Sequence, residues 1–96
     1  MKLYEYTLSI DEEQELKKEG VFVYIIKLSN NKYYTGITKN LVVRLLQHSN
    51  GLSKSTRQFR PIVLKWITKF SNYKDARWLE KKIKNRGARN YLCHNK

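Results

Sequence analysis

The stretch VFVYIIKLSNNKYYTGI, residues 21–37, decides the fold. Its first part, Val21 to Leu28, is a nearly continuous apolar, β-branched and aromatic run, which is typical of a strand buried on both faces. Asparagine tolerates left-handed backbone angles, so the Ser-Asn-Asn segment at 29–31 predicts a turn. The following KYYTGI segment, residues 32–37, predicts a second strand, and the whole stretch therefore predicts a β-hairpin.

The length of this turn determines which side chains share a face of the hairpin. Side chains alternate between the two faces of a sheet, so a slip of one residue moves every side chain to the other face. A three-residue loop pairs Tyr24 with Gly36 and places Tyr24 and Tyr34 on one face. A two-residue Asn30-Asn31 turn places the two tyrosines on opposite faces, which would count against a shared site.

The rest of the chain predicts a helix, a third strand and a second helix. Residues 40–51 begin with Asn40, a favourable N-cap, and end at Gly51. A polar, basic loop follows, and residues 62–70 show the rough alternation of a strand. The second helix is expected between Asn72 and Gly87, with one more short helical turn after it. We therefore expect a small α+β domain with a short antiparallel sheet.

The net charge of +12 is unevenly distributed along the 96 residues. Residues 1–20 hold six acidic residues and three lysines, whereas residues 21–96 hold seventeen cationic and only two acidic residues. We interpret the first segment as an acidic N-terminal extension and the second as a single basic domain. Such a domain attracts polyanions, with nucleic acid as the leading partner and an anionic membrane as the second.

Two further features narrow the setting. No stretch approaches the roughly 20 apolar residues that span a bilayer, and no helix has a basic face opposite a broad apolar one, so we expect no membrane partner. The single cysteine, Cys93, excludes an internal disulfide and a multi-thiolate metal site. The N-terminus shows no signal-peptide pattern. We therefore expect an intracellular protein, cytoplasmic or nucleoid-associated or nuclear, that is not secreted.

Glu80 is the one carboxylate in the basic segment RWLEKKIKNR, residues 77–86. On a helix it shares a face with three apolar residues that should meet the core, namely Ala76, Leu79 and Ile83. An ionised carboxylate at the margin of a core is costly unless it is paired or bound to a cation. A salt bridge to a neighbouring Lys or Arg is one explanation. In a basic nucleic-acid binder we favour the other, a ligand for catalytic Mg²⁺.

Two side chains on the first predicted helix are candidate companions of Glu80. Arg44 and His48 are one turn apart and lie on one face. The guanidinium of Arg44 suits a phosphate, and His48 can exchange a proton near neutral pH. The alternative is an exposed arginine and a half-buried histidine, with His48 beside the edge of a buried arc formed by Leu41, Val42, Leu45 and Leu46.

The hairpin offers two further candidates. Tyr24 and Tyr34 are ten residues apart on the two strands; aromatic residues in strands usually pack. A tyrosine hydroxyl beside a metal and an arginine can instead accept a proton or bind phosphate. Gly36 follows in the second strand, where a side chain would crowd anything lying on the sheet.

Five fragments in this order resemble the GIY-YIG nuclease domain, most closely its small stand-alone URI-type members. They are VYI at 23–25, YTG at 34–36, RLLQH at 44–48, STRQFRP at 55–61 and LEKKIK at 79–84. The resemblance covers residues 21–83. It implies a three-stranded antiparallel sheet flanked by helices, and divalent-metal-dependent cleavage of a phosphodiester.

The resemblance also assigns roles residue by residue. Tyr24 and Tyr34 match the tyrosines of the two motifs, Arg44 matches the helix arginine, His48 matches a His-or-Tyr position, and Glu80 matches the metal-binding glutamate. The first motif reads Val-Tyr-Ile and the second Tyr-Thr-Gly, which departs from the family pattern but keeps both tyrosines. The family's further elements have candidate matches at Thr56, Arg60, Pro61, Asn85 and Asn90. Arg60 is expected to contact phosphate, and Pro61 to set the entry to the third strand.

We therefore expect an endonuclease that uses one Mg²⁺ or Mn²⁺ ion at Glu80 and cuts nucleic acid, with DNA favoured. Tyr34 or His48 would be the general base, Arg44 would stabilise charge on the phosphate, and Tyr24 would orient the phosphate or water. Flanking contacts are expected from five cationic residues: Lys54, Arg57, Arg60, Lys81 and Lys84.

Two rival interpretations stay open at this point. One is a non-catalytic nucleic-acid-binding module that keeps the nuclease fold. The other is a regulatory subunit whose acidic N-terminal helix docks on a basic partner or on its own groove. Because the chain has no additional recognition domain, high sequence specificity would require a protein partner or an oligomer.

Overall fold

The computed structural model describes residues 20–94. The described elements are, in order, β1 (Val21–Lys27), β2 (Tyr33–Thr38), α2 (Leu41–Ser49), the short 3₁₀ helix η1 (Arg57–Phe59), β3 (Val63–Phe70), α3 (Tyr73–Arg86) and α4 (Ala88–His94). The predicted α+β fold is confirmed, and the predicted strand boundaries agree to within one residue. The acidic N-terminal extension, with its predicted helix, lies outside the described residues except for Gly20.

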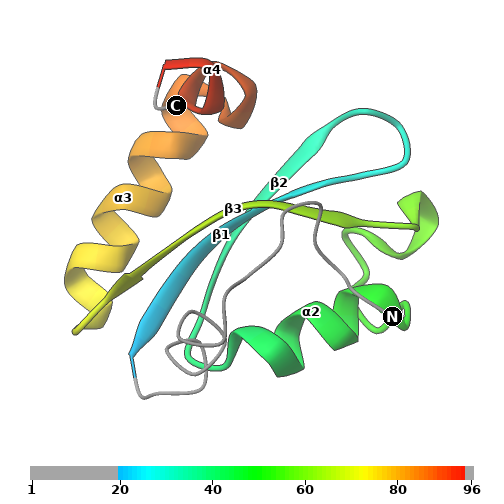
Figure 1. Cartoon of the computed structure of the whole chain (residues 1–96), viewed down its shortest axis with the longest axis horizontal. Helices are drawn as coiled ribbons and strands as arrows, with labels where there is room; N and C mark the ends of the chain where they lie inside the picture. Colours follow the sequence, from blue (N-terminus) through cyan, green and yellow to red (C-terminus); the bar gives the residue numbers. More distant parts are fainter. Residues whose placement is uncertain (1–19, 95–96) are drawn as a thin grey trace.

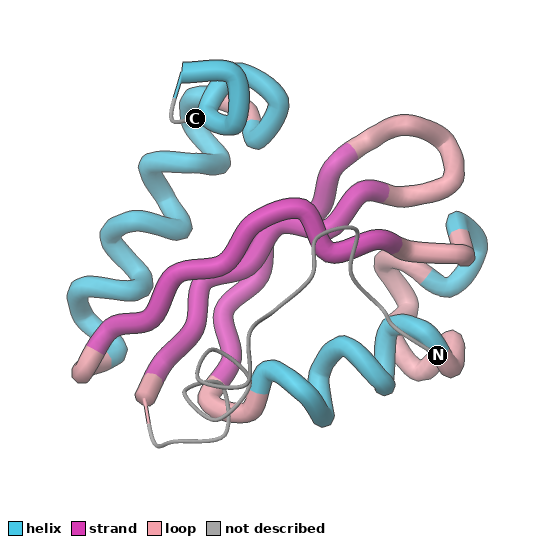
Figure 2. The backbone as a smooth tube through the Cα atoms, in the orientation of Figure 1, coloured by secondary structure: helices cyan, strands magenta, loops and turns pink. Residues whose placement is uncertain are grey.

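The sheet has the strand order β2-β1-β3, and both pairings are antiparallel. Figure 2 shows the three strands side by side, with the helices outside them. β1 is the central strand, and its first six residues are all buried. This confirms the prediction from the apolar run that β1 is covered on both faces.

The two faces of the sheet support separate halves of the core. Figure 1 shows α2 on one side of the sheet, with α3 and α4 on the other. Phe22, Tyr24 and Ile26 of β1 pack on the α2 side against Leu41 and Leu45. The alternate residues of β1 are Val21, Val23 and Ile25. They pack on the α3 side with Ala76, Leu79, Ile83 and Tyr91. Strand alternation therefore sends Tyr24 to the α2 face.

The hairpin turn is the three-residue loop Ser29–Asn31. The amide of Leu28 donates to the carbonyl of Lys32 at 2.8 Å, and Asn31 has a φ of 66°. Asparagine accepts this left-handed conformation more readily than most residues. In the resulting register Tyr24 pairs with Gly36, so Tyr24 and Tyr34 share a face, as the odd loop length predicted.

The predicted helix caps are also present. The side chain of Asn40 accepts a hydrogen bond from the amide of Val43 at 3.2 Å, and that of Asn72 accepts one from the amide of Asp75 at 2.9 Å. These bonds satisfy amides that the first helical turn leaves without a partner. Gly87, with a φ of 89°, ends α3.

One prediction for α2 was wrong. Leu41 and Leu45 are buried, but Leu46 is 46% exposed and Val42 is only half-buried. The third fully buried position is His48, which was expected at the edge of the arc. The loop after α2 explains the difference, because it brings the buried hydroxyl of Thr56 to the imidazole and so makes its burial tolerable.

Candidate active site

Three rings from three different elements form a cluster on the α2 face of the sheet. Tyr24 comes from β1, Tyr34 from β2 and His48 from α2. The ring centroids are 6.4 Å apart for Tyr24 and Tyr34, 5.8 Å for Tyr24 and His48, and 5.2 Å for Tyr34 and His48. Antiparallel pairing and the i, i+4, i+7 spacing of Leu41, Leu45 and His48 on α2 produce this convergence.

His48 is held on both sides of its ring. Its Nε2 lies 2.9 Å from the hydroxyl of Tyr24, and its Nδ1 lies 2.8 Å from the hydroxyl of Thr56. The side chain is 0% exposed. Burial, together with the smaller effect of the positive charge of Arg44, lowers the pKa of His48 to about 4. The imidazole is therefore neutral near pH 7, with one nitrogen donating and the other accepting.

Thr56 is the partner that sequence reasoning did not assign. It is 0% exposed and lies in the loop just before η1. Among the described residues, no buried side-chain nitrogen or oxygen lacks a hydrogen-bond partner, so the row from Tyr24 through His48 to Thr56 is satisfied throughout. The STRQFRP fragment pointed to Thr56, but only the folded loop shows its partner.

We expect the neutral state of His48 to make the fold sensitive to acid. The unfolded chain binds a proton at a pKa near 6.5, whereas the folded one does so only near 4, so the unfolded state holds more protons between these values. The free energy of unfolding should fall as the pH drops from 6.5 towards 4, by on the order of 3 kcal/mol. Urea unfolding across this range measures the slope.

His48→Gln is the control for this slope, because the chain has a second histidine, His94, and several carboxylates that also titrate. The variant should be less stable at pH 7 but should show a shallower pH dependence than the wild type. Identical slopes in the two proteins would contradict a depressed pKa at His48.

Arg44 lies beside the two tyrosines. Its Nη1 donates to Oε1 of Gln47 at 3.0 Å, which holds the side chain along α2. Partial burial works to lower the pKa of Arg44, but the neighbouring phenols of Tyr24 and Tyr34 raise it overall. Burial also raises the pKa of Tyr24 to about 12, although Arg44 acts against this shift. The cluster thus combines a fixed cation with a neutral phenol at Tyr24.

Gly36 makes room for Tyr24. A Cβ atom at this position would lie 2.3 Å from both Cζ and Oη of the Tyr24 ring. No real Cβ contact is that short, so any other residue at 36 would displace the phenol. The prediction that a side chain here would crowd the sheet surface is borne out, and the crowded group is Tyr24 itself.

Glu80 lies on α3, on the other side of the sheet from the three rings. Its side chain is 14% exposed, and Oε2 lies 3.5 Å from Nζ of Lys84, one turn away and 57% exposed. Its negative charge contributes to the raised pKa of Tyr24, so the carboxylate lies within electrostatic range of that hydroxyl. The salt bridge that was the alternative explanation for Glu80 is present, but it is a pair with a largely exposed lysine and is weak.

The donor set permits only a sparsely ligated metal. No group of three or more His, Cys, Asp or Glu side chains gathers anywhere in residues 20–94. His48 is buried with both nitrogens engaged. Of the carboxylates in residues 20–94, Glu80 is the one within electrostatic range of Tyr24. One carboxylate suits Mg²⁺, which keeps several waters and takes substrate phosphate as a further ligand.

The remaining candidates lie outside the ring cluster. The five expected phosphate contacts are all exposed, namely Lys54, Arg57, Arg60, Lys81 and Lys84. Arg60 donates through Nε to the carbonyl of Arg57 at 3.0 Å and lies against Gly51. Pro61 is exposed two residues before β3, Asn90 donates to the carbonyl of Arg86 at 3.2 Å, and Asn85 is exposed on α3.

Comparison with known sequences decides the family. The sequence profile of the GIY-YIG catalytic domain matches residues 20–92. This chain belongs to the GIY-YIG family. A UPF0213 protein of Staphylococcus haemolyticus is 39% identical over 64 residues, which is 66% of this chain and 78% of the relative. A putative GIY-YIG domain-containing protein of Invertebrate iridescent virus 6 is 37% identical over 71 residues, 71% of each chain.

A solved structure shares the GIY-YIG fold seen here. The solution structure of a UPF0213 protein from Bacillus halodurans superposes with a TM-score of 0.50 at 27% sequence identity, covering 75% of this chain and 78% of that one. The recognition of a small stand-alone GIY-YIG protein is therefore confirmed. GIY-YIG proteins are generally endonucleases that use a divalent metal, and nucleic acid is the general substrate of the family. Within residues 20–94, no helix is both long and apolar enough to cross a membrane.

Proposed function

We propose that this protein is a divalent-metal-dependent endonuclease that hydrolyses phosphodiester bonds in nucleic acid, with DNA favoured. The observation that carries the proposal is that Tyr24, Tyr34 and Arg44 come together from three different elements, with Glu80 of a fourth element within electrostatic range of Tyr24. Core packing alone does not require a guanidinium and a carboxylate within electrostatic range of a buried phenol. A phosphodiester beside a cation does require such groups.

In this proposal Glu80 holds one Mg²⁺ or Mn²⁺ ion. The ion would supply positive charge at the scissile phosphate and at the leaving 3′ oxygen. Lys84 forms an ion pair with this carboxylate. Because the lysine side chain is 57% exposed, it can turn into solvent at little cost in free energy. Substrate phosphate and water complete the shell that a single carboxylate leaves open.

The other side chains bind and orient. Arg44 stabilises charge on the phosphate through its planar fork of donors. Of the two candidate general bases, Tyr34 is the one that solvent can reach, since His48 is fully buried. We assign proton removal from water to Tyr34, which lies beside the positive charge of Arg44. His48 and Thr56 then act as positioning residues that fix the hydroxyl of Tyr24.

The Glu80–Lys84 pair also favours a second candidate, a non-catalytic nucleic-acid-binding module. In that case the carboxylate is only the partner of a surface lysine, and the basic surface binds nucleic acid without cleaving it. We further propose that high sequence specificity requires a protein partner or an oligomer, and that the protein is intracellular. The location fits the free, exposed thiol of Cys93.

Nicking of a supercoiled plasmid tests the proposal. We expect the wild type to nick with Mg²⁺ or Mn²⁺ and to be silent in EDTA. Arg44→Lys keeps the charge but loses the planar fork, and should slow nicking about 100-fold. Lys32→Ala, a change of an exposed lysine in the hairpin loop, is the control for lost charge. Metal-independent binding without any cutting by the wild type would favour the binding module.

A further inference from the structure

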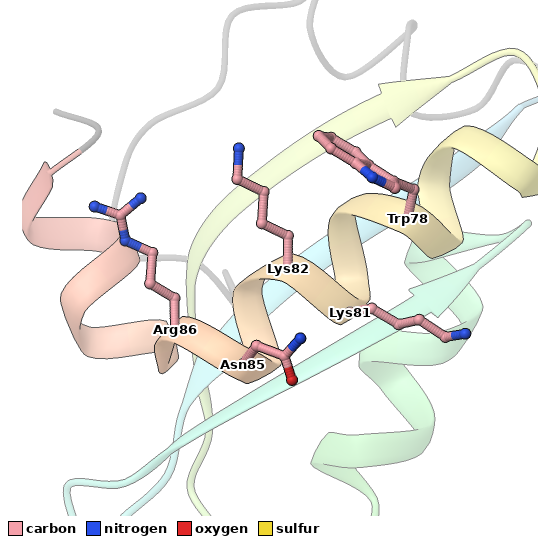
Figure 3. A pocket seen from close by; sticks show the side chains of 5 residues that line it. All are labelled: Trp78, Lys81, Lys82, Asn85 and Arg86. Carbon is pink, nitrogen blue, oxygen red and sulfur yellow. The ribbon is translucent and has the colours of Figure 1, made fainter.

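The outer face of α3 carries a shallow groove of about 540 Å³ that the proposed active site does not use. It is lined by one aromatic, one amide and three cationic side chains: Trp78, Lys81, Lys82, Asn85 and Arg86. Figure 3 shows Trp78, Lys82 and Arg86 projecting from one side of the helix and Lys81 and Asn85 from the other. The i, i+4 spacing of Trp78, Lys82 and Arg86 stacks them in a row along the helix.

Trp78 has no role in the core. It is 64% exposed, while the buried face of α3 consists of Ala76, Leu79 and Ile83. The other tryptophan, Trp66, packs edge-on against Tyr91 with ring centroids 5.2 Å apart. A tryptophan is the largest apolar side chain, and exposing most of it amid charged neighbours makes it a candidate contact residue.

The groove is chemically matched to a strand of nucleic acid. Nζ of Lys82 lies 5.0 Å from the centroid of the Trp78 ring, so a cation already sits over the aromatic surface. Lys81 and Arg86 add two more positive charges, and no acidic side chain lines the groove. An aromatic platform flanked by cations is the arrangement that binds single strands, in which a base stacks and the phosphates meet lysine or arginine.

We propose that this groove, Trp78 with Lys81, Lys82, Asn85 and Arg86, binds an unpaired segment of nucleic acid with one base stacked on Trp78. The proposal rests on the proposed function only for the class of ligand and does not require cleavage. Helical geometry separates it from the metal position, because Glu80 is two residues beyond Trp78 and so about 200° away around the helix. Lys81 lies between the two around the helix.

Two other occupants fit less well. In a duplex the bases are stacked on one another, so they cannot lie on Trp78 without being unstacked. A second copy of this chain in a two-fold contact would bring the same three cations face to face, which costs binding energy. A single strand both offers a free base and carries negative charge.

The first test uses Trp78 as its own probe. Trp66→Phe leaves Trp78 as the single tryptophan, and the titration uses short oligothymidine in EDTA so that no cleavage occurs. We expect quenching of the Trp78 emission that saturates with the oligonucleotide, and little quenching by a duplex of the same length. Absence of quenching overturns the proposal. A change that follows protein concentration instead of oligonucleotide would assign the groove to self-association.

The second test measures affinity for a labelled oligothymidine by anisotropy. Trp78→Leu should weaken binding about tenfold, the usual worth of one base stack, and Trp78→Tyr should restore part of it. In the double variant Lys82→Gln/Arg86→Gln, the slope of the logarithm of the binding constant against the logarithm of salt concentration should become shallower by about 1.4, since two phosphate contacts are lost. The matched control, Lys27→Gln with Lys32→Gln, removes two charges outside the groove. An equal loss of affinity in the two double variants overturns the proposal, whether or not the wild type nicks plasmid.

Discussion

Glu80→Gln is expected to reduce metal-dependent cleavage by at least about 1000-fold, because a metal ion that stabilises transition-state charge contributes several kcal/mol and each tenfold in rate corresponds to about 1.4 kcal/mol. Glutamine keeps the size and shape of the side chain but loses the negative charge that holds a dication. Nucleic-acid affinity in EDTA should be unchanged or slightly higher, since one repulsive charge near the phosphates is gone. The measurements are single-turnover nicking and oligonucleotide binding.

The matched control for this variant is Lys84→Gln. It breaks the same ion pair, whose Nζ and Oε2 atoms are 3.5 Å apart, but keeps the carboxylate. If Glu80 matters only as the partner of Lys84, the two variants will lose the same activity. We expect Lys84→Gln to lose far less cleavage than Glu80→Gln, because it removes only one exposed phosphate contact. Neither variant should lose more than about 1 kcal/mol of stability, the usual limit for an exposed pair. Binding of Mn²⁺, followed by its magnetic resonance signal, should be lost in Glu80→Gln only.

The hairpin register was left open by the sequence, because asparagine suits both a two-residue and a three-residue loop. The structure has the three-residue loop with Asn31 at a positive φ, and this length places Tyr24 opposite Gly36. The hairpin itself could be predicted from local chemistry, and so could α3, whose ends are set by Asn72 and Gly87. These features depend on a few neighbouring residues, and a single sequence contains all of that information.

The environment of His48 could not be predicted, because it depends on residues distant in the sequence. Helical periodicity predicted one buried arc for α2, formed by the leucines and Val42, with His48 beside its edge. The choice depends on whether a buried imidazole finds partners, and those are Tyr24 in β1 and Thr56 in the loop after the helix. Nothing in the local pattern states where that loop will fold. The groove around Trp78 could not be predicted for a related reason, because helical periodicity places Trp78 off the buried face of α3 but does not say which side chains gather around an exposed ring.

Gly36→Ala is expected to damage both stability and activity, because the new methyl group would occupy the place of the Tyr24 phenol. The added Cβ would lie 2.3 Å from Cζ and Oη of Tyr24 and 2.8 Å from Cε1. Tyr24 is 1% exposed and hydrogen-bonded to His48, so the ring cannot move without breaking that bond. Overpacking costs about 1–3 kcal/mol, and an unpaired buried polar group costs a similar amount.

The expected result is a loss of roughly 2–5 kcal/mol in the free energy of unfolding, measured by urea denaturation, together with a fall in nicking of at least about 100-fold under conditions where the variant is still folded. Gly36 is not among the residues with positive φ, so alanine meets no backbone strain there and the cost comes from space alone. The decisive comparison is to introduce Gly36→Ala into the Tyr24→Leu variant and measure both properties again.

In that background the colliding phenol is absent, so Gly36→Ala should cost much less than it does in the wild type. An equal cost in both backgrounds would mean that β2 needs glycine for a reason unrelated to Tyr24. The two-residue coupling also separates stability from chemistry, because Tyr24→Leu should impair nicking by itself whether residue 36 is glycine or alanine. A cycle with strong coupling in both stability and activity would assign Gly36 to one task, which is to leave room for the phenol that the proposed site requires.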